Sequence, residues 1–108
     1  ANQALILSQL EALGYSAELA KNGQEALNML ANNSYELLIT DCNMPLVDGY
    51  KLAKTIRERG NNSMPIIALT ADAFPEKKAE CLKAGMNDLI TKPVNLETLN
   101  LMIDKYLN

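Results

Sequence analysis

Apolar residues along this chain alternate between short unbroken runs and helical stripes, and their order predicts an α/β fold. The unbroken runs predict buried strands at residues 36–40, 65–71 and 88–91, and a weaker edge strand at residues 16–20. Helical stripes lie before, between and after these runs; one of them joins Leu96, Leu99, Ile103 and Leu107 and is expected to face the core. The alternation predicts right-handed crossovers and a doubly wound parallel sheet with helices on both faces.

The predicted helices begin and end at residues suited to those positions. Asn22, Asp48 and Asn95 can each cap a helix N-terminus with a side-chain oxygen, and Glu25 stands at the reciprocal capping position after Asn22. Pro75 suits a first helical turn, and Gly14, Gly60 and Gly85 suit helix ends. The pattern predicts one domain over residues 1–108 that is incomplete at its N-terminus, because the chain begins inside a helix without a strand to precede it.

Composition excludes several classes of function. The chain has 108 residues, a net charge of −3 and no histidine. Imidazole acid–base chemistry and histidine metal ligation are therefore excluded, and interspersed charges argue against a nucleic-acid surface. No glycine-rich phosphate loop is present. Cys42 and Cys81 match neither a disulfide framework nor a metal-binding spacing, and they are expected to be reduced thiols.

Three polar side chains stand at the ends of successive predicted strands: Asp41, Thr70 and Lys92. The carboxyl ends of parallel strands meet at one edge of the sheet, where ligands bind in open α/β folds. A carboxylate, a hydroxyl and an ammonium at one edge are the groups that phosphoryl transfer needs, since that chemistry depends mainly on positioning and charge neutralisation. The sequence therefore predicts a small phosphoryl site at this edge.

Four motifs in this order resemble the receiver domain of two-component signalling: Asp41-Cys-Asn-Met-Pro-Leu-Val-Asp-Gly, Ala68-Leu-Thr-Ala, Ala84-Gly-Met-Asn-Asp and Thr91-Lys-Pro. The resemblance covers essentially the whole chain and is strongest to receivers fused to hybrid sensor histidine kinases. It implies a flavodoxin-like fold with strand order 2-1-3-4-5, here lacking the first strand.

The resemblance also implies roles for individual residues. Asp41 would take a phosphoryl group from a phosphohistidine, Thr70 would be the switch hydroxyl, and Lys92 would pair with the phosphate. The backbone carbonyl of Asn43 would bind a divalent metal together with Asp41. The Lys92–Pro93 peptide bond would be cis.

Two departures from the family pattern affect the site. The family carries an acidic pair at the end of its first strand, and those acids hold Mg²⁺; both are absent here, so Mg²⁺ binding by this chain is expected to be weak or absent. The family often has an aromatic switch residue three positions before the lysine, and this position is Leu89.

Two other functions remain open on the sequence. The missing acidic pair also fits a pseudo-receiver, an interaction module that is never phosphorylated. A flavin enzyme of the same topology is a third reading, although one Phe, four Tyr and no Trp offer few rings to enclose a flavin.

The resemblance implies a histidine kinase or a histidine phosphotransfer domain as partner. The domain itself would be a phosphoacceptor. The protein would be an enzyme if the domain is part of a hybrid sensor histidine kinase, which carries a kinase domain as well. No apolar run approaches the length that spans a bilayer, so a cytoplasmic domain without direct membrane contact is expected, in a parent protein that can be membrane-anchored. Two explanations of the missing strand stay open: the sequence is trimmed from a longer one, or self-association or a rearrangement of the chain fills the gap.

Overall fold

The computed structural model describes residues 2–43, 47–72 and 74–107. It contains five helices and three strands within those residues. In chain order they are α1 (Asn2–Ala12), α2 (Gly23–Asn32), β1 (Leu38–Asp41), α3 (Gly49–Glu58), β2 (Ile66–Thr70), α4 (Pro75–Ala84), β3 (Asp88–Thr91) and α5 (Leu96–Leu107). None of the described helices is both long enough and apolar enough to cross a membrane.

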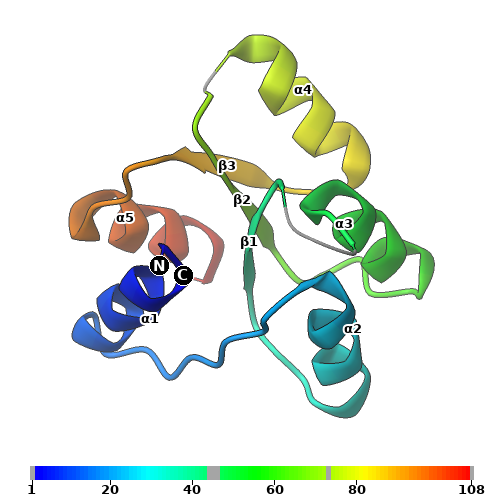
Figure 1. Cartoon of the computed structure of the whole chain (residues 1–108), viewed down its shortest axis with the longest axis horizontal. Coiled ribbons are helices and arrows are strands. Elements are labelled where there is room, and N and C mark those ends of the chain that lie inside the picture. The colour runs from blue at the N-terminus through cyan, green and yellow to red at the C-terminus, as the bar shows by residue number, and fades with distance from the viewer. Residues whose placement is uncertain (1, 44–46, 73, 108) are drawn as a thin grey trace.

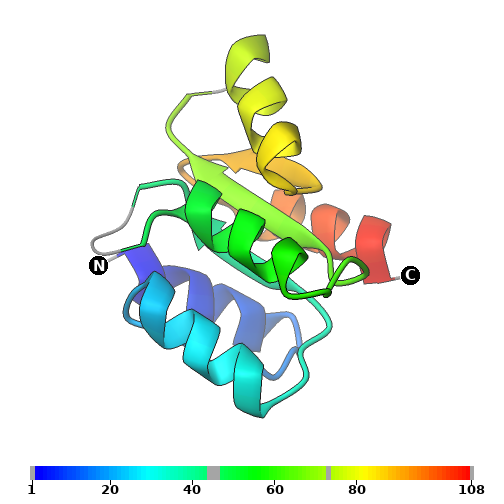
Figure 2. The ribbon, with the colours of Figure 1, turned by 90° about the vertical axis from the view of Figure 1, so that its right-hand side faces the viewer.

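The strands form a parallel sheet in the order β1-β2-β3, with helices on both faces. Helices α1 and α5 cover one face, and α2, α3 and α4 cover the other (Figure 1). Figure 2 looks onto the face covered by α2, α3 and α4, with α3 in front of the sheet. This arrangement confirms the predicted doubly wound α/β class.

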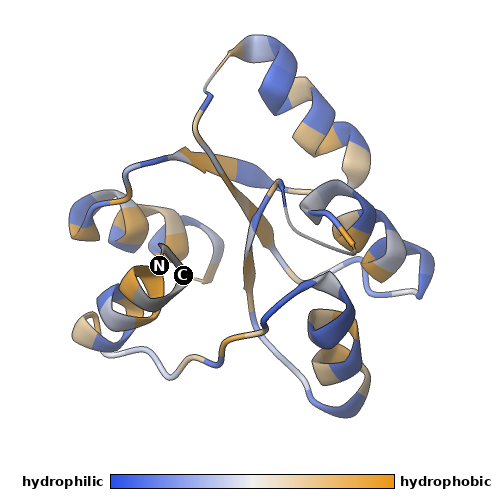
Figure 3. Cartoon of the chain, in the orientation of Figure 1, coloured by the Kyte–Doolittle hydropathy of each residue, from blue (hydrophilic) through white to orange (hydrophobic). Residues whose placement is uncertain are grey.

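Strand β2 is the centre of the core, because all five of its residues are buried. Its side chains alternate between the two faces. Ile66 and Ala68 pack with α2, α3 and α4, whereas Ile67 and Leu69 pack with α1 and α5. Burying an Ile or Leu side chain stabilises a fold by about 1.5–3 kcal/mol, so β2 alone is a large part of the stability. Figure 3 shows the apolar strands between helices whose outer faces are hydrophilic.

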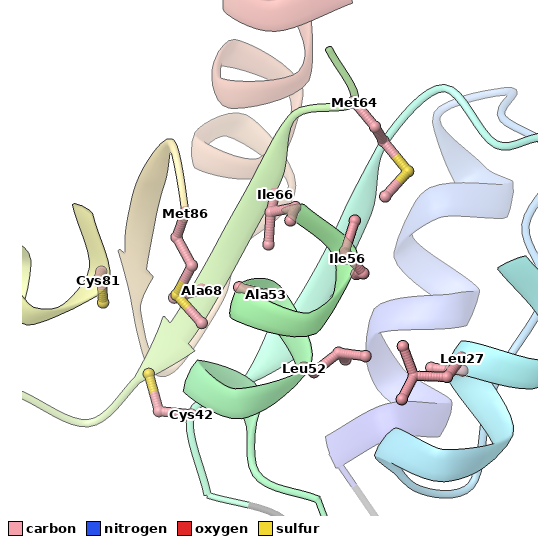
Figure 4. Packing of buried hydrophobic residues seen from close by; sticks show 11 residues of the cluster. Leu27, Cys42, Leu52, Ala53, Ile56, Met64, Ile66, Ala68, Cys81 and Met86 are labelled. Atoms are coloured by element: carbon pink, nitrogen blue, oxygen red, sulfur yellow. The ribbon is translucent and has the colours of Figure 1, made fainter. Parts of the chain in front are cut away.

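The first of the two clusters is built from small and flexible side chains around β2 (Figure 4). Leu52, Ala53 and Ile56 come from one stripe of α3 and lie between Leu27 of α2 and Cys81 of α4. The stripe has the three-and-four spacing that places side chains on one helical face. It fixes α3 against the sheet.

The predicted helix ends are confirmed. Asn22, Asp48 and Asn95 each accept a hydrogen bond from a backbone N–H three residues later, at 2.8 Å. Gly85 ends α4 in the left-handed region at φ 104°, which glycine adopts without a steric cost. Glu25 differs slightly from a reciprocal capping box, since its carboxylate accepts from the N–H of Lys21 rather than from that of Asn22.

The predicted edge strand at residues 16–20 is wrong: this segment forms no strand in the structure. The described sheet accordingly has three strands instead of the four expected. A strand needs a hydrogen-bonded neighbour, and β1, the nearest strand along the chain, pairs only with β2 within the described residues. Local β-propensity therefore did not suffice to make a strand here.

The other differences are smaller. Strand β1 is offset from the predicted range, and β2 is shorter than predicted. In the stripe of α5, Leu99 and Ile103 are buried as predicted, but Leu96 is 44% exposed because it lies in the first turn, beyond the edge of the core. The Met44-Pro45 turn of the first motif and Ala1 lie outside the described residues.

Candidate phosphoryl site

Asp41 is the last residue of β1 and stands at the carboxyl edge of the sheet, as predicted. Its backbone is in register with Leu69 of β2. Its carboxylate Oδ1 lies 2.6 Å from Nζ of Lys92, which follows β3. Asp41 Oδ1 accepts no hydrogen bond within the described residues, so the contact is an ion pair without hydrogen-bond geometry.

The ion pair is partly open to solvent. The Asp41 side chain is 17% exposed and that of Lys92 31% exposed. Pairs that solvent reaches contribute little to stability, since water screens the charges. The contact therefore contributes little to the stability of the fold. Its importance is that an anionic ligand at Asp41 would also lie next to the ammonium of Lys92.

Thr70 ends β2 between the other two residues, because β2 lies between β1 and β3. It is 6% exposed, and its hydroxyl accepts a hydrogen bond from the N–H of Asp72 at 3.2 Å. The backbone N–H of Lys92 donates to the carbonyl of Thr70 at 2.8 Å, which fixes where the Lys92 side chain leaves the sheet. The Lys92–Pro93 bond is cis, as the resemblance implied.

Gly49 is a structural residue of the site that the sequence analysis did not single out beyond its place in the motif. Its N–H donates to the carbonyl of Cys42 at 3.0 Å. A Cβ atom at this position would overlap the backbone of Asp41 and would lie 3.0 Å from Cα of Cys42. Since Gly49 is the first residue of α3, its missing side chain lets that helix begin directly against the backbone of Asp41. In the sequence, the Asp48-Gly49 pair that follows the strand-ending Asp41 is the pattern that could have predicted this role of Gly49.

Asn43 and Leu89 complete the predicted set. Asn43 is exposed next to the Asp41 loop. Leu89 is the second residue of β3, is partly buried, and packs against the α2–α3–α4 cluster. A group of three or more acidic, cysteine or histidine side chains that could hold a metal does not occur in the part of the chain that the structure describes.

The layer beneath the Asp41 loop holds Cys42, Cys81 and Tyr50. Both thiols are buried and free, as the sequence predicted. Burial, followed by the neighbouring Cys42, raises the pKa of Cys81 to about 11. Burial likewise raises the pKa of Tyr50, with Cys42 as the next cause. Both shifts favour the neutral forms, so Tyr50 and Cys81 add no charge to the site.

The geometry supports phosphoryl chemistry more than flavin chemistry. The Asp41 carboxylate, the Lys92 ammonium 2.6 Å away and the strand-ending hydroxyl of Thr70 gather at one sheet edge. A flavin reading would need aromatic rings at this edge. The chain has one Phe, the 65% exposed Phe74, and no Trp.

Comparisons with known proteins give the same picture over nearly the whole chain. The response regulator receiver domain family matches residues 1–104. The sensor histidine kinase RcsC of Salmonella typhimurium is 39% identical over 105 residues, which are 97% of this chain and 11% of that protein. The chain therefore spans about a tenth of the length of this relative.

Solved structures agree. The receiver domain of the sensor histidine kinase PA1611 from Pseudomonas aeruginosa, with magnesium in its active-site cleft, superposes with a TM-score of 0.89 at 36% identity, covering 98% of this chain and 88% of that one. The receiver domain of Ssk1 from Saccharomyces cerevisiae, crystallised with the histidine phosphotransfer protein Ypd1, gives 0.89 at 35% identity over 97% of this chain and 80% of that one.

With the fold, the motifs and these similarities in agreement, the chain belongs to the response regulator receiver domain family of two-component signal transduction.

Proposed function

We propose that Asp41 accepts a phosphoryl group from a phosphohistidine and holds it as an aspartyl phosphate. The observation that carries the proposal is the 2.6 Å contact between Asp41 Oδ1 and Lys92 Nζ at the carboxyl edge of the sheet. A carboxylate oxygen would attack phosphorus as the phosphorus–nitrogen bond breaks, and the imidazole of the donor would leave and take up a proton.

Lys92 and Thr70 would stabilise the product. The ammonium of Lys92 already lies beside the oxygen that would carry the phosphoryl group, so it can balance the added negative charge. The hydroxyl of Thr70 can donate as well as accept, and turning it toward the phosphate would break its contact with the N–H of Asp72. Phosphorylation would thus be coupled to the loop that follows β2.

Magnesium is the metal that fits this chemistry, and it would be held by the Asp41 carboxylate and the Asn43 carbonyl. A hard cation prefers oxygen ligands, and when bound it would neutralise charge on the phosphoryl oxygens. With one carboxylate contributed by the described residues, we expect binding weaker than about 1 mM. Calorimetric titration of the chain with magnesium checks this, and saturation at micromolar magnesium would contradict it.

The partner proposed for the domain is a histidine kinase or a histidine phosphotransfer domain. The similarity to RcsC and PA1611, both named sensor histidine kinases, supports a parent protein of the hybrid kinase type. The similarity to the Ssk1 receiver domain, which was crystallised with the phosphotransfer protein Ypd1, supports a partner of the second kind.

The test compares two aspartates of the same loop. The chain is incubated with a small phosphodonor at high magnesium, and its intact mass is measured. We expect one added phosphoryl group, lost in Asp41→Asn and retained in Asp48→Asn, since Asn can still cap α3 at position 48. Equal labelling of Asp41→Asn and the unchanged chain would refute the assignment, and no labelling of the chain by any donor would favour a receiver that only binds.

A further inference from the structure

The backbone around Lys92 is held from two directions. On one side, the N–H of Lys92 donates to the carbonyl of Thr70 at 2.8 Å. On the other side, the side-chain Nε2 of Gln9 donates to the carbonyl of Val94, also at 2.8 Å. Gln9 belongs to α1 and lies 85 positions before Val94 in the sequence, so this contact joins the first helix to the loop between β3 and α5.

The hydrogen bond from Gln9 gives this loop a direction that its apolar contacts do not supply. Val94 follows Lys92 by two positions, is 9% exposed, and belongs to the same cluster as Ile6 of α1 and Leu99 of α5. Apolar contacts of this kind hold a side chain but are not directional. The bond from Gln9 instead fixes where the Val94 carbonyl points, and therefore the course of the backbone that leads back to Lys92.

The course of this backbone decides what the Lys92 ammonium can reach. Nζ stands at the end of a flexible aliphatic stem, 2.6 Å from Asp41 Oδ1, and the side chain is 31% exposed. Packing therefore holds it only in part, and the point at which its backbone leaves the sheet governs how well the ammonium stays beside the carboxylate. In an active site, misplacing a group by about 1 Å can slow a reaction by about 100-fold.

The other end of the Gln9 amide supports the same role. Its Oε1 is buried and has no hydrogen-bond partner within the described residues. A buried acceptor without a partner costs stability, so packing alone would favour an apolar side chain of similar length at this position. The amide is explained by what its donor does at Val94.

We propose that Gln9 is a positioning residue of the phosphoryl site: its amide fixes the backbone at Val94 and thereby keeps the Lys92 ammonium beside the Asp41 carboxylate. The effect of Gln9 on phosphorylation rests on the function proposed for Asp41. Its effect on the contact between Lys92 and Asp41 does not, and the two effects are measured separately.

The first experiment measures that contact by nuclear magnetic resonance in the unphosphorylated chain. Asp41→Asn removes a charge 2.6 Å from Lys92 Nζ, so the change that it causes in the chemical shift of the Lys92 ε-methylene group reports how close the two groups are. Gln9→Met nearly keeps the length of the side chain and removes the donor. We expect the shift change to fall to about half or less in the Gln9→Met background, as in a double-mutant cycle.

Two control backgrounds separate positioning from a general effect on α1. Ser8→Met introduces the same side chain at an exposed position of α1. Ile6→Val removes a methylene group from the cluster that contains Val94, and so weakens the packing of α1 while Gln9 is retained. In both backgrounds, the shift change should stay within about a fifth of its value in the unchanged chain.

The second experiment follows phosphorylation by intact mass, with a small phosphodonor at high magnesium. Gln9→Met should gain the phosphoryl group at least about threefold more slowly than the unchanged chain, because its ammonium is less well placed. Ser8→Met and Ile6→Val should gain it at the rate of the unchanged chain. If the unchanged chain takes no label, the function proposed for Asp41 fails, and the shift measurement still decides the role of Gln9.

An unchanged shift response in Gln9→Met, or labelling at the full rate, would overturn the proposal. An equal loss of the response in Ile6→Val would also overturn it, by assigning the effect to the packing of α1. Should Gln9→Met not fold, the unchanged chain decides. The side-chain amide protons of Gln9 should exchange at least about tenfold more slowly than those of the exposed Gln24, and equal exchange would exclude a lasting bond to Val94.

Discussion

At the scale of single residues, the site depends on one charge contact and one missing side chain. Lys92 reaches Asp41 because its own backbone is bonded to Thr70 at the end of the neighbouring strand. Gly49 allows α3 to begin against the backbone of Asp41, where any Cβ atom would overlap. The ion pair adds little stability because solvent reaches it, whereas a side chain at position 49 would force the backbone of Asp41 or α3 to move. Both features place groups around the carboxylate.

Replacing Lys92 with alanine is therefore expected to separate stability from response. The free energy of unfolding should change by less than about 1 kcal/mol, because the ion pair is partly exposed. The amide shifts that phosphorylation or a phosphate analogue causes at Thr70 and in α4 should largely disappear. Denaturant unfolding and amide spectra measure the two quantities.

The control for this variant is Lys51→Ala, which removes an exposed lysine from α3. It should leave both the stability and the amide shifts as they are. An unchanged response to phosphate in Lys92→Ala would refute the role given to Lys92.

At the scale of elements, Asp88 joins α4, β3 and α5. It starts β3 with its side chain 8% exposed, 3.0 Å from Lys105 of α5 and 3.5 Å from Lys78 of α4. The hydroxyl of Tyr106 donates to the same carboxylate at 2.8 Å, so this ring is partly buried and not the freely exposed ring expected of a surface tyrosine. One carboxylate thus holds two helices in place at the edge of the sheet opposite Asp41.

This cluster predicts a pH dependence. Burial acts to raise the pKa of Asp88, but hydrogen bonds from the N–H of Leu89, from Lys105 and from Tyr106, together with the charge of Lys78, outweigh it and lower the pKa. A carboxyl whose pKa is lower in the folded state stabilises the fold above its unfolded pKa. That stability is lost as pH falls through the folded pKa.

We therefore expect Asp88→Asn to destabilise the domain by about 1–3 kcal/mol at neutral pH and to weaken its loss of stability in acid. Unfolding in denaturant at neutral and acidic pH measures both effects. The matched variant Asp72→Asn, at an exposed position, should keep the acid sensitivity. Identical acid profiles for Asp88→Asn and the unchanged chain would contradict the role of the cluster.

At the scale of the whole molecule, stability is expected to be uneven across the sheet. Strand β2 has a neighbour on each side and helices on both faces, whereas residues 16–20 have no backbone partner within the described residues. Amide exchange follows the cost of local opening, which is small where backbone groups are unpaired.

The amides of Ile67 and Leu69 should accordingly exchange most slowly. The amides of residues 16–20 should exchange at rates close to those of an unfolded loop. Hydrogen exchange followed by nuclear magnetic resonance measures this gradient. Strong protection of residues 16–20 in a sample shown to be monomeric would contradict it.

Much of this architecture follows from local signals in the sequence. The apolar run around Ile67 predicts a strand buried on both faces, because every side chain of such a strand meets a helix layer. Asn22, Asp48, Asn95 and Gly85 predict helix ends, because their chemistry satisfies backbone groups locally. Asp41, Thr70 and Lys92 are predicted to lie at the same edge of the sheet, because each stands at the end of a strand and parallel strands run in the same direction.

Tertiary structure alone decided the rest. Residues 16–20 have the composition of a strand, yet pairing requires a neighbour, which no local pattern supplies. The sequence placed Asp41 and Lys92 at one edge but could not set the 2.6 Å between them, which depends on the register of three strands and on the path of the chain after β3.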